Sequence, residues 1–306
     1  MFGSPLVNRK IAMNHAHNSP LVSVIIPTFN NENTIGQQLE ALYDQTYSGS
    51  WEVIVADNGS SDRTKEVVLF WASLMTNLRI INASDRPGAN FARNAGVKES
   101  RGSLLLLCDG DDVADVHWVA EMVQALSFHD IVGGLLERTK LNDKAALAAR
   151  PLKPQLGLLD SFRFLPYSPF ANTAMHRKVW TETGAFDTSY VYGSDDVEFF
   201  WRAQMKGARI GFAPNAVMYY RLRSDLRGIA RQAFRYGYSH PKLFKSYKSL
   251  GMPQSDLQQA YLEWIWIMIH LYWLINRKPR QAEWIYRFAL RLGRLLASIR
   301  HLVLYL

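Results

Sequence analysis

The feature that most constrains the fold of this chain is a series of short apolar segments separated by segments of helical character. The apolar segments are LVSVIIPTF (21–29), WEVIVAD (51–57), LRII (78–81), GSLLLLCDG (102–110) and DIVGGLL (130–136). Helical spacing of apolar residues, or residues typical of helix starts, marks 33–46, 60–74, 88–100 and 115–126. Strands that are apolar throughout, with helices between them, predict an α/β, Rossmann-like fold whose mostly parallel sheet carries helices on both faces.

The pattern changes after the fifth predicted strand. Residues 137–170 are polar and contain four prolines, so we expect an irregular segment there, either a mobile loop or a lid. NTAMHRKVWTETGAFD (172–187) predicts a strand, a short helix and a turn that ends on glycine. Residues 193–214 predict a helix that begins near Ser194 and ends at Gly207, followed by another strand.

Three loops of the predicted sheet carry the residues of chemical interest. In open α/β sheets, ligands bind beyond the carboxyl ends of the strands. The loops at those ends of the first, second and fourth strands read PTFN, ADNGSSD and CDGDD, and two of them contain carboxylates. We therefore expect these three loops to form one ligand-binding crevice.

The stretch LLLLCDGDD (104–112) brings an apolar strand directly to Asp109, Asp111 and Asp112. Carboxylates two residues apart beyond a strand can share one hard cation such as Mg²⁺ or Mn²⁺, whose other ligands are water and phosphate oxygens. The simpler alternative is a solvated turn, since Asp is common in turns. A calcium EF-hand loop is excluded, because glycine is missing at its sixth position and Ala120 stands where it requires glutamate.

Other classes of protein are alternatives to an enzyme with a metal site. The DGD triplet also resembles the phosphoaspartate loop of haloacid-dehalogenase-type phosphatases, but in that family the nucleophilic aspartate follows the first core strand rather than the fourth. A non-catalytic nucleotide-sugar sensor remains a further alternative. A dinucleotide dehydrogenase is disfavoured, because no GxGxxG follows the first strand.

Cys108 is the only cysteine, which excludes an intramolecular disulfide. Inside an apolar run, a lone cysteine is predicted to pack as a small hydrophobe, and this fits a reducing compartment. Residues 1–20 lack the apolar core of a secretory signal, so we interpret them as a flexible tail.

The net charge of +8 is concentrated in the C-terminal third. Residues 221–250 carry eight basic side chains and one acidic one, and residues 276–306 carry seven and one. Residues 1–220 are slightly acidic. A nucleic-acid-binding enzyme would have positive charge around its active site, so this distribution indicates a docking surface instead.

The ordered set of motifs resembles family 2 glycosyltransferases, which have the GT-A fold. The motifs are VSVIIPTFNNENTIGQQLEAL, EVIVADNGSSDRT, RPGANFARNAG, LLLLCDGDD, TAMHRKVWTETGAFD and YGSDDVEFFWRAQMKGARIGF. The resemblance covers 21–220, with a donor half at about 21–112 and an acceptor half at about 113–220. It implies an inverting transferase that takes one sugar from a UDP- or GDP-sugar donor to a glycan or lipid-linked acceptor.

The resemblance also implies a set of site residues. Asp109 and Asp111 match the DxD pair that binds Mg²⁺ or Mn²⁺, with Asp109 also near the sugar and ribose, and Asp196 matches the general base. Asp112 is expected to assist the pair by a hydrogen bond or through water. The residues expected to contact the nucleotide sugar are Pro27, Thr28, Asn30, Asp57, Arg93, Asn94 and Asp109.

Two positions depart from the family pattern or match it only loosely. Tyr220 stands near the place where a histidine is frequent. QAFRY (232–236) is similar to the QxxRW signature of processive members, with Tyr236 in place of tryptophan.

The segment 221–306 is predicted to be a basic, amphipathic helical region. WIWIMIHLYWLI (264–275) has no charge but is shorter than the roughly 20 apolar residues that a membrane span needs. After Pro279, Arg287, Arg291 and Arg294 border an apolar stripe, which suits a helix lying on anionic lipid. We therefore expect a cytoplasmic protein, peripheral on the inner face of the cell membrane. The alternative is a helical hairpin that packs on the catalytic domain, or on a second subunit in a homodimer.

Overall fold

The structure is a computed structural model that describes residues 21–150, 154–275 and 278–306, so the tail expected at 1–20 lies outside it. The chain forms two compact units. The first runs to Leu135 and includes 170–186 and 206–218. The second comprises 136–169, 187–205 and 219–306. This division differs from the contiguous domains expected above, because part of the predicted catalytic region groups with the C-terminal helices.

Within the described residues, a sheet of eight strands has the order β3-β2-β1-β4-β7-β6-β8-β5. The strands are β1 (Val22–Thr28), β2 (Trp51–Asp57), β3 (Leu78–Asn82), β4 (Leu104–Cys108), β5 (Val113–Ala114), β6 (Ile131–Glu137), β7 (Asn172–His176) and β8 (Ile210–Tyr219). Strands β1 to β4 pair in parallel, whereas β7 is antiparallel to both β4 and β6. The expected parallel sheet is therefore confirmed for its first half, and the other half is mixed.

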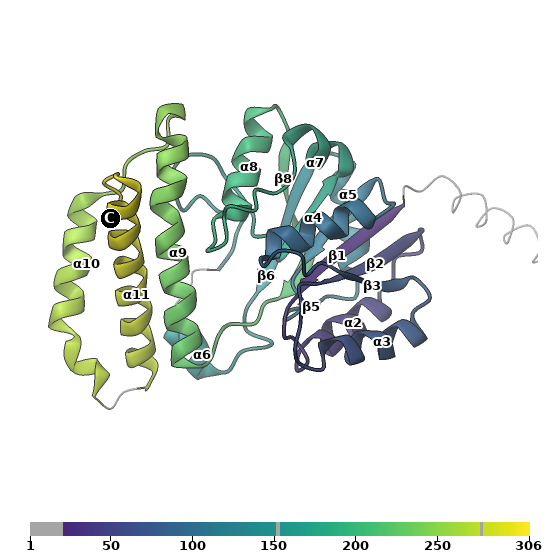
Figure 1. Cartoon of the computed structure of the whole chain (residues 1–306), viewed down its shortest axis with the longest axis horizontal. Coiled ribbons are helices and arrows are strands. Elements are labelled where there is room, and N and C mark those ends of the chain that lie inside the picture. Colours follow the sequence, from purple (N-terminus) through teal and green to yellow (C-terminus); the bar gives the residue numbers. More distant parts are fainter. Residues whose placement is uncertain (1–20, 151–153, 276–277) are drawn as a thin grey trace, which may run out of the picture. The chain divides into compact units, whose positions relative to one another are not determined.

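Helices cover both faces of the parallel strands (Figure 1). Those of the first unit are α2 (Ile35–Tyr43), α3 (Thr64–Leu74), α4 (Ala89–Glu99), α5 (Trp118–Leu126) and α7 (Arg177–Thr183). Helices α2 and α3 lie on one side of β1–β3, and α4 lies on the other. Gly96 permits the close approach of α4, since a Cβ there would lie 2.5 Å from Cγ2 of the buried Ile25. The core is thus a layer of strand side chains between two helical layers.

The second unit is mainly helical. Its helices are α6 (Lys144–Ala149), α8 (Asp195–Met205), α9 (Leu226–Tyr247), α10 (Leu257–Ile269) and α11 (Lys278–His301), with 3₁₀ turns η1 (Lys248–Leu250) and η2 (Leu271–Leu274). Asp143, Asp225 and Asp256 cap α6, α9 and α10, each accepting a hydrogen bond from the backbone N–H three residues on. Helices α9, α10 and α11 lie side by side (Figure 1).

The segment at 137–170 is largely irregular, as expected, but it also contains α6, which the analysis of the sequence missed. KAALAA is only six residues long and shows no amphipathic period, so its stability depends on the Asp143 cap and on packing against α11. The lid expected for this segment stays a prediction.

The start of α3 is held by Asp62 rather than by the side chain of its N-cap residue. Arg63 occupies the N-cap position and makes no side-chain capping bond. Asp62, one residue earlier, accepts hydrogen bonds from the N–H and the hydroxyl of Thr64, at 3.0 and 2.6 Å. Its other carboxylate oxygen accepts the N–H of Glu32 at 3.0 Å. Asp62 therefore joins the loops that follow β1 and β2.

The arginines of α11 are placed differently from the expectation of a lipid-facing row. Arg287 forms ion pairs with Glu263 and Glu283, at 3.1 and 2.8 Å. Arg294 donates a hydrogen bond to Nδ1 of His240 at 3.0 Å. These side chains turn toward α9 and α10, because partly buried guanidinium groups need partners. These contacts give Arg287 and Arg294 partners within the protein, and the expected contact of α11 with lipid stays a prediction.

No helix in the described ranges combines the length and the hydropathy needed to cross a bilayer.

Candidate functional site

The carboxyl ends of β1, β2 and β4 lie at one edge of the sheet. The parallel register pairs Thr28 of β1 with Asp57 of β2, and Ile25 of β1 with Leu107 of β4. The three loops that the sequence analysis singled out therefore follow adjacent strands and begin at neighbouring positions. This arrangement confirms that the first unit gathers them at one edge.

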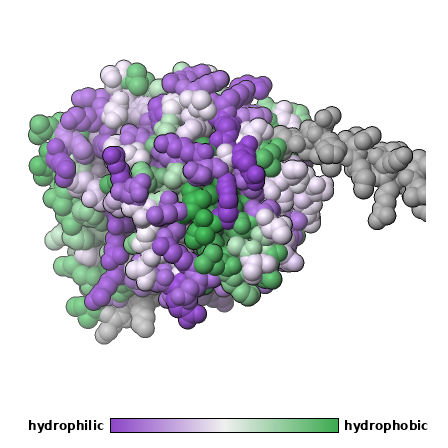
Figure 2. All heavy atoms as spheres, turned by 45° about the vertical axis from the view of Figure 1, so that its right-hand side comes forward, coloured by the Kyte–Doolittle hydropathy of each residue, from purple (hydrophilic) through white to green (hydrophobic). Residues whose placement is uncertain are grey.

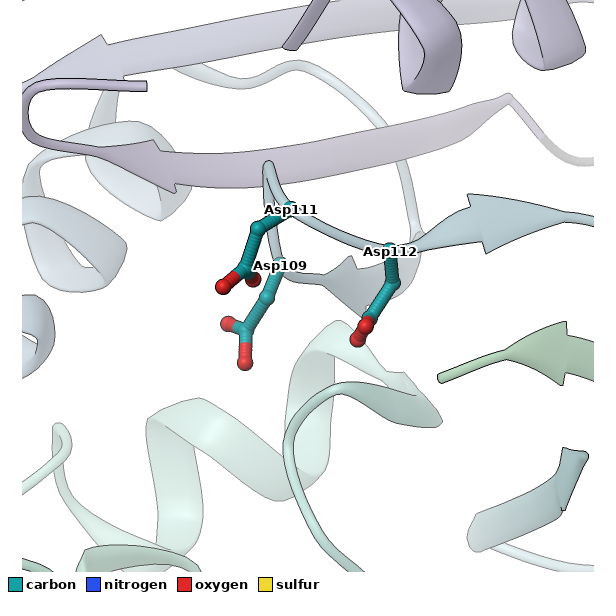
Figure 3. A group of neighbouring side chains, drawn as sticks. All are labelled: Asp109, Asp111 and Asp112. Atoms are coloured by element: carbon teal, nitrogen blue, oxygen red, sulfur yellow. The ribbon is translucent and has the colours of Figure 1, made fainter. Parts of the chain in front are cut away.

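Three carboxylates converge directly beyond β4. Asp109, Asp111 and Asp112 each offer a carboxylate oxygen within 4.8 Å of the others. Figure 3 shows the Asp109 and Asp111 carboxylates beside each other, with that of Asp112 directed to the same side of the loop. Asp112 is 1 % exposed, whereas Asp109 and Asp111 are partly exposed. Like charges at this separation repel, and a set of hard oxygen donors suits Mg²⁺ or Mn²⁺. The donor set thus fits the metal expected from the DxD resemblance.

Arg93 of α4 orients one of these carboxylates. Its Nη2 lies 2.9 Å from Oδ1 of Asp109, and its side chain is 7 % exposed. Asn90 accepts a hydrogen bond from its Nη1 at 3.1 Å, and the ring of Phe170 lies 5.0 Å from the guanidinium carbon. A buried guanidinium held on three sides loses little entropy when it binds a carboxylate. Arg93 therefore positions Asp109, and the residue expected near the donor does lie at the acidic loop.

Gln38 of α2 is part of this site and was missed by the sequence analysis. The fully buried side chain accepts the N–H of Ala114 at 2.8 Å and donates to the carbonyl of Asp109 at 3.4 Å. It thereby links the two ends of the acidic loop. A signal was present, since Gln38 stands on the apolar face of its helix, between Ile35 and Leu42, where a buried amide requires partners.

The loop after β1 is fastened to the loop after β2. Asn30, with a left-handed φ of 53°, accepts the N–H of Ser61 at 2.8 Å. Asp57 is 1 % exposed, and its carboxylate accepts the N–H of Ser60 at 3.2 Å. The hydroxyl of Thr28 donates to Asn31 at 3.1 Å. These contacts shape the wall of the edge, while contact with a nucleotide stays a prediction for each of them.

Pro27 and Asn94, which were also expected at the nucleotide, both contact other parts of the protein. Pro27 is buried within β1. Asn94 donates to the carbonyl of Phe186 at 2.8 Å, and its carbonyl oxygen accepts from the N–H of Phe186 and from Nε1 of Trp180. The amide of Asn94 therefore holds the segment after α7 in place. Its expected contact with the donor has no support from these contacts.

Cys108 ends β4 and is fully buried. Burial and the negative charge of Asp109 raise the pKa of its thiol, so it stays protonated and unreactive. This environment agrees with the packing role expected from the sequence.

Asp196 belongs to the second unit, in the first turn of α8. Its Oδ1 accepts the N–H of Val197 at 2.8 Å. Burial, together with the negative charge of Asp196, raises the pKa of the hydroxyls of Tyr167 and Tyr236. The helix dipole stabilises negative charge at this end of a helix. The expected base is therefore a carboxylate at a helix start, in electrostatic contact with two tyrosines.

Comparison with known proteins identifies the family. The model of glycosyl transferase family 2 matches residues 23–205, and that of glycosyl transferase family group 2 matches residues 161–304. The chain belongs to glycosyl transferase family 2. This assignment excludes the phosphatase alternative, and the DGDD loop is the acidic loop of a glycosyltransferase.

Named relatives agree with this family. Glycosyltransferase AglE of Haloferax volcanii is 32% identical over 201 residues, which are 65% of this chain and 66% of AglE. A second relative, from Methanococcus voltae, is 26% identical over 231 residues, 71% of each chain. It is named dolichyl N-acetyl-alpha-D-glucosaminyl phosphate 3-beta-D-2,3-diacetamido-2,3-dideoxy-beta-D-glucuronosyltransferase.

A solved structure shows the same fold. The mannosyltransferase PcManGT of Pyrobaculum calidifontis, in complex with GDP-Man and Mn²⁺, superposes with a TM-score of 0.62 and 19% identity. The match covers 95% of this chain and 94% of PcManGT. The GT-A fold expected from the sequence, followed by C-terminal helices, is therefore confirmed for this glycosyltransferase.

Proposed function

We propose that this glycosyltransferase moves one sugar, with inversion, from a UDP- or GDP-sugar to a glycan or lipid-linked acceptor. The observation that carries the proposal is the convergence of Asp109 and Asp111 beyond β4, with Arg93 bound to Asp109. The similar mannosyltransferase was solved with GDP-Man and Mn²⁺, and the name of the Methanococcus relative includes a dolichyl-linked sugar phosphate. These likenesses support a nucleotide-sugar donor and a lipid-linked acceptor used in the synthesis of cell-surface glycans or glycolipids.

Asp109 and Asp111 would hold Mg²⁺ or Mn²⁺, with Asp112 supporting the loop. When bound there, the ion stabilises the negative charge on the diphosphate as it leaves C1 of the sugar. Arg93 keeps the Asp109 carboxylate in one orientation, and Gln38 keeps the loop ends together. The acidic loop is therefore arranged before the donor binds.

Asp196 is proposed as the general base. In an inverting transfer, the acceptor oxygen bonds to C1 while the bond from C1 to the diphosphate oxygen breaks, and the hydroxyl proton goes to a carboxylate. The position of Asp196 at the start of α8 favours its ionised form, which is the form able to accept that proton.

A binding and turnover experiment tests both assignments. The full chain is screened by thermal shift with UDP- and GDP-sugars, with and without Mn²⁺, and turnover is followed with the best donor. Asp111→Asn should abolish the metal-dependent shift, whereas Asp196→Asn should keep the shift but lower kcat by at least about 100-fold. Asp44→Asn, an exposed aspartate at the end of α2, is the matched control.

Three outcomes would contradict the proposal. Full turnover by Asp196→Asn removes the base assignment. A metal-dependent shift with no turnover by the native chain on any acceptor favours the nucleotide-sugar sensor. Retention of the donor's anomeric configuration in the product, read by NMR, would exclude inversion.

We also propose that α10 rests on the cytoplasmic face of the cell membrane as a peripheral contact. Its outward side carries large apolar side chains at helical spacing, each at least one-third exposed: Tyr261, Leu262, Ile265, Met268, Ile269 and Tyr272 of η2. Hydrophobic residues line the left-hand margin of the surface in Figure 2, on the side where α10 lies. Such a face suits the lipid boundary where a lipid-linked acceptor is found.

Exposed arginines on α9 supply positive charge for anionic lipid in place of those expected on α11. Arg227, Arg231 and Arg235 recur every four residues and are all exposed. A polybasic row of this kind contributes about 1 kcal/mol per charge near an anionic surface. The attraction of basic side chains to anionic lipid is thus still proposed, but from α9 instead of α11.

Vesicle flotation tests this contact. Met268→Glu should lower binding to vesicles that contain anionic lipid by about tenfold, because a carboxylate replaces an apolar side chain in the boundary. Leu69→Glu, on the exposed side of α3, is the matched control and should bind as the native chain does. Unchanged flotation of Met268→Glu refutes the membrane contact. A shift from dimer to monomer in that variant would instead identify a second copy as the occupant of α10.

A further inference from the structure

The loop at 189–194 leads directly into α8, and its last two residues have an unusual backbone. Gly193 has a φ of 121° and Ser194 a φ of 59°. Glycine adopts positive φ without cost, but a residue with a Cβ does so only where surrounding contacts hold it there. Ser194 is 8 % exposed, so the contacts that hold it come from the protein rather than from water.

Ser239 of α9 makes one such contact. The hydroxyl oxygens of Ser194 and Ser239 lie 2.7 Å apart, and Ser239 is 4 % exposed. Ser239 also donates its hydroxyl hydrogen to the carbonyl of Tyr236 at 2.8 Å. A hydroxyl has only one hydrogen to donate, so Ser194 is the donor and Ser239 the acceptor in the bond between the two serines. Because both hydroxyls are buried, water cannot easily replace either bond when it is lost.

Lys242, nearly one turn further along α9, holds the other end of the loop. Its Nζ donates to the carbonyl and to the hydroxyl of Ser189, at 2.7 Å each, and lies 3.9 Å from the ring centre of Tyr190. Ser239 and Lys242 are three residues apart and therefore lie on the same side of the helix. One side of α9 thus fixes both ends of the loop that precedes α8.

The position of Ser194 determines where α8 begins. Its carbonyl oxygen accepts the N–H of Glu198 at 3.0 Å, and this hydrogen bond closes the first turn of the helix. Asp196, the proposed base, lies inside that turn. Ser194, Asp196 and Ser239 all belong to the second unit, so the contacts that link them lie within one unit.

We propose that Ser239 is a positioning residue for the general base, acting through Ser194 on the first turn of α8. This inference rests on the proposed role of Asp196. A displacement of about 1 Å at a catalytic group can lower a rate by about 100-fold, so a loosened helix start is sufficient to slow proton transfer. Because Ser239 acts on the base and not on the donor, its loss should affect kcat and leave donor binding unchanged.

Amide hydrogen exchange of the full chain tests whether Ser239 holds the start of α8. Ser239→Ala removes the acceptor for Ser194 but favours helix in α9, since alanine has the higher helix propensity. The amides of the first turn of α8, including that of Glu198, should exchange at least about tenfold faster as the turn opens locally. Ser73→Ala is the matched control, because the Ser73 hydroxyl also donates to the carbonyl three residues earlier, that of Phe70, but lies on the exposed side of α3. It should leave exchange in α8 unchanged.

Turnover tests the consequence for the base. The reaction is hydrolysis of the nucleotide sugar that gives the largest thermal shift with Mn²⁺: the water oxygen bonds to C1 as the diphosphate leaves, and the water proton goes to the same base. Ser239→Ala should lower kcat by at least about tenfold at an unchanged KM for the donor. Ser194→Ala removes the same hydrogen bond from its other side, so the double variant should lose no more than about the larger of the two single losses.

The outcomes separate this inference from the proposed function. Native exchange in α8 of Ser239→Ala shows that Ser239 does not hold Ser194 and overturns the inference. Faster exchange with a native kcat also overturns it, whereas loss of turnover by Asp196→Asn would still support the base. Full turnover by Asp196→Asn removes the base assignment and, with it, any catalytic role of Ser239. A fall in kcat with a matching rise in KM would indicate a general loss of structure, which excludes a positioning role.

Discussion

Gln38 shows how much of the acidic loop depends on an uncharged side chain. The loop contains three carboxylates that repel one another, and it must remain in place before any cation binds. Gln38 fastens its beginning at the carbonyl of Asp109 and its end at the N–H of Ala114. Both bonds are made from a fully buried position on α2, where water cannot replace them.

Replacing Gln38 with leucine tests this fastening. The variant keeps the apolar bulk but leaves two backbone groups unsatisfied, so the free energy of unfolding should fall by about 1–3 kcal/mol. The midpoint for Mn²⁺ in the presence of nucleotide should rise as the loop loosens. Urea unfolding and metal titration measure the two effects. Gln124→Leu, at an exposed position of α5, should change neither, and equal effects of both substitutions would contradict the role of Gln38.

The packing of α9 against α11 depends on two glycines that face each other. A Cβ at Gly237 would lie 2.0 Å from the carbonyl oxygen of Leu290, and one at Gly293 would lie 2.3 Å from that of Phe234. Both obstacles are backbone atoms, which cannot rotate away. The two helices therefore approach more closely than any larger side chain would allow. This close contact places the rings of Tyr236 and Tyr286 beside the guanidinium of Arg150.

Gly237→Ala is predicted to destabilise the chain, against its helix propensity. Alanine in a helix interior is favoured over glycine by about 1 kcal/mol, but here the added methyl group must push α9 and α11 apart, at an expected net cost of about 2 kcal/mol. Gly36→Ala in α2 is the control, since its Cβ would meet nothing closer than 3.5 Å and should be neutral or stabilising. Thermal unfolding of both variants decides the matter, and a stabilised Gly237→Ala would show that the helices can separate without cost.

For the chain as a whole, the dependence of stability on pH should follow carboxylates that are paired in the native state. Asp130, directly before β6, accepts the backbone N–H of Arg209 and forms ion pairs with Lys178 and Arg209, at 3.2 Å each. The Arg209 N–H, chiefly, and the neighbouring cations lower the pKa of Asp130 to about 2, although partial burial opposes the shift. Asp130 therefore stabilises the native state above about pH 4, and this contribution is lost as the pH falls toward 2.

Asp130→Asn should show this dependence of stability on pH. At pH 7 the variant should be less stable by about 1–2 kcal/mol, and the difference should shrink to about half by pH 3, where the unfolded aspartate is largely protonated. Urea unfolding across pH 3–7 measures the gap. Asp44→Asn, at an exposed site, should show a small and nearly constant gap. A gap for Asp130→Asn that does not change with pH would mean that its charge is not the stabilising feature.

Much of the fold and part of the site could be predicted because they depend on residues that are close together in the chain. The strands β1 to β4, the turn at Gly184 and the start of α8 at Asp195 were predicted from local periodicity and from end signals. The convergence of Asp109 and Asp111 was also predictable, since two residues that directly follow one strand cannot separate far.

Features that join distant parts of the chain were not predictable in this way. Gln38 meets a loop that begins 71 residues later, and Arg150 meets Gln232 after 82 residues. Arg294 turns inward because it meets His240, 54 residues earlier, although its spacing along α11 suited a lipid surface equally well. The order of apolar and polar residues specifies which side of a helix or strand is buried. It does not specify which distant segment packs against that side.

The local pattern of the chain was thus sufficient for the class of fold, the family and the acidic pair, because strand and helix periods and short motifs act over a few residues. The antiparallel position of β7, the close contact of α9 with α11 and the tyrosine rings beside Arg150 required the folded chain. In those places a side chain acquires its role only from the burial and charge that remote segments supply. Loss of the α9–α11 contact would therefore change the surroundings of Arg150 without altering a single motif in the sequence.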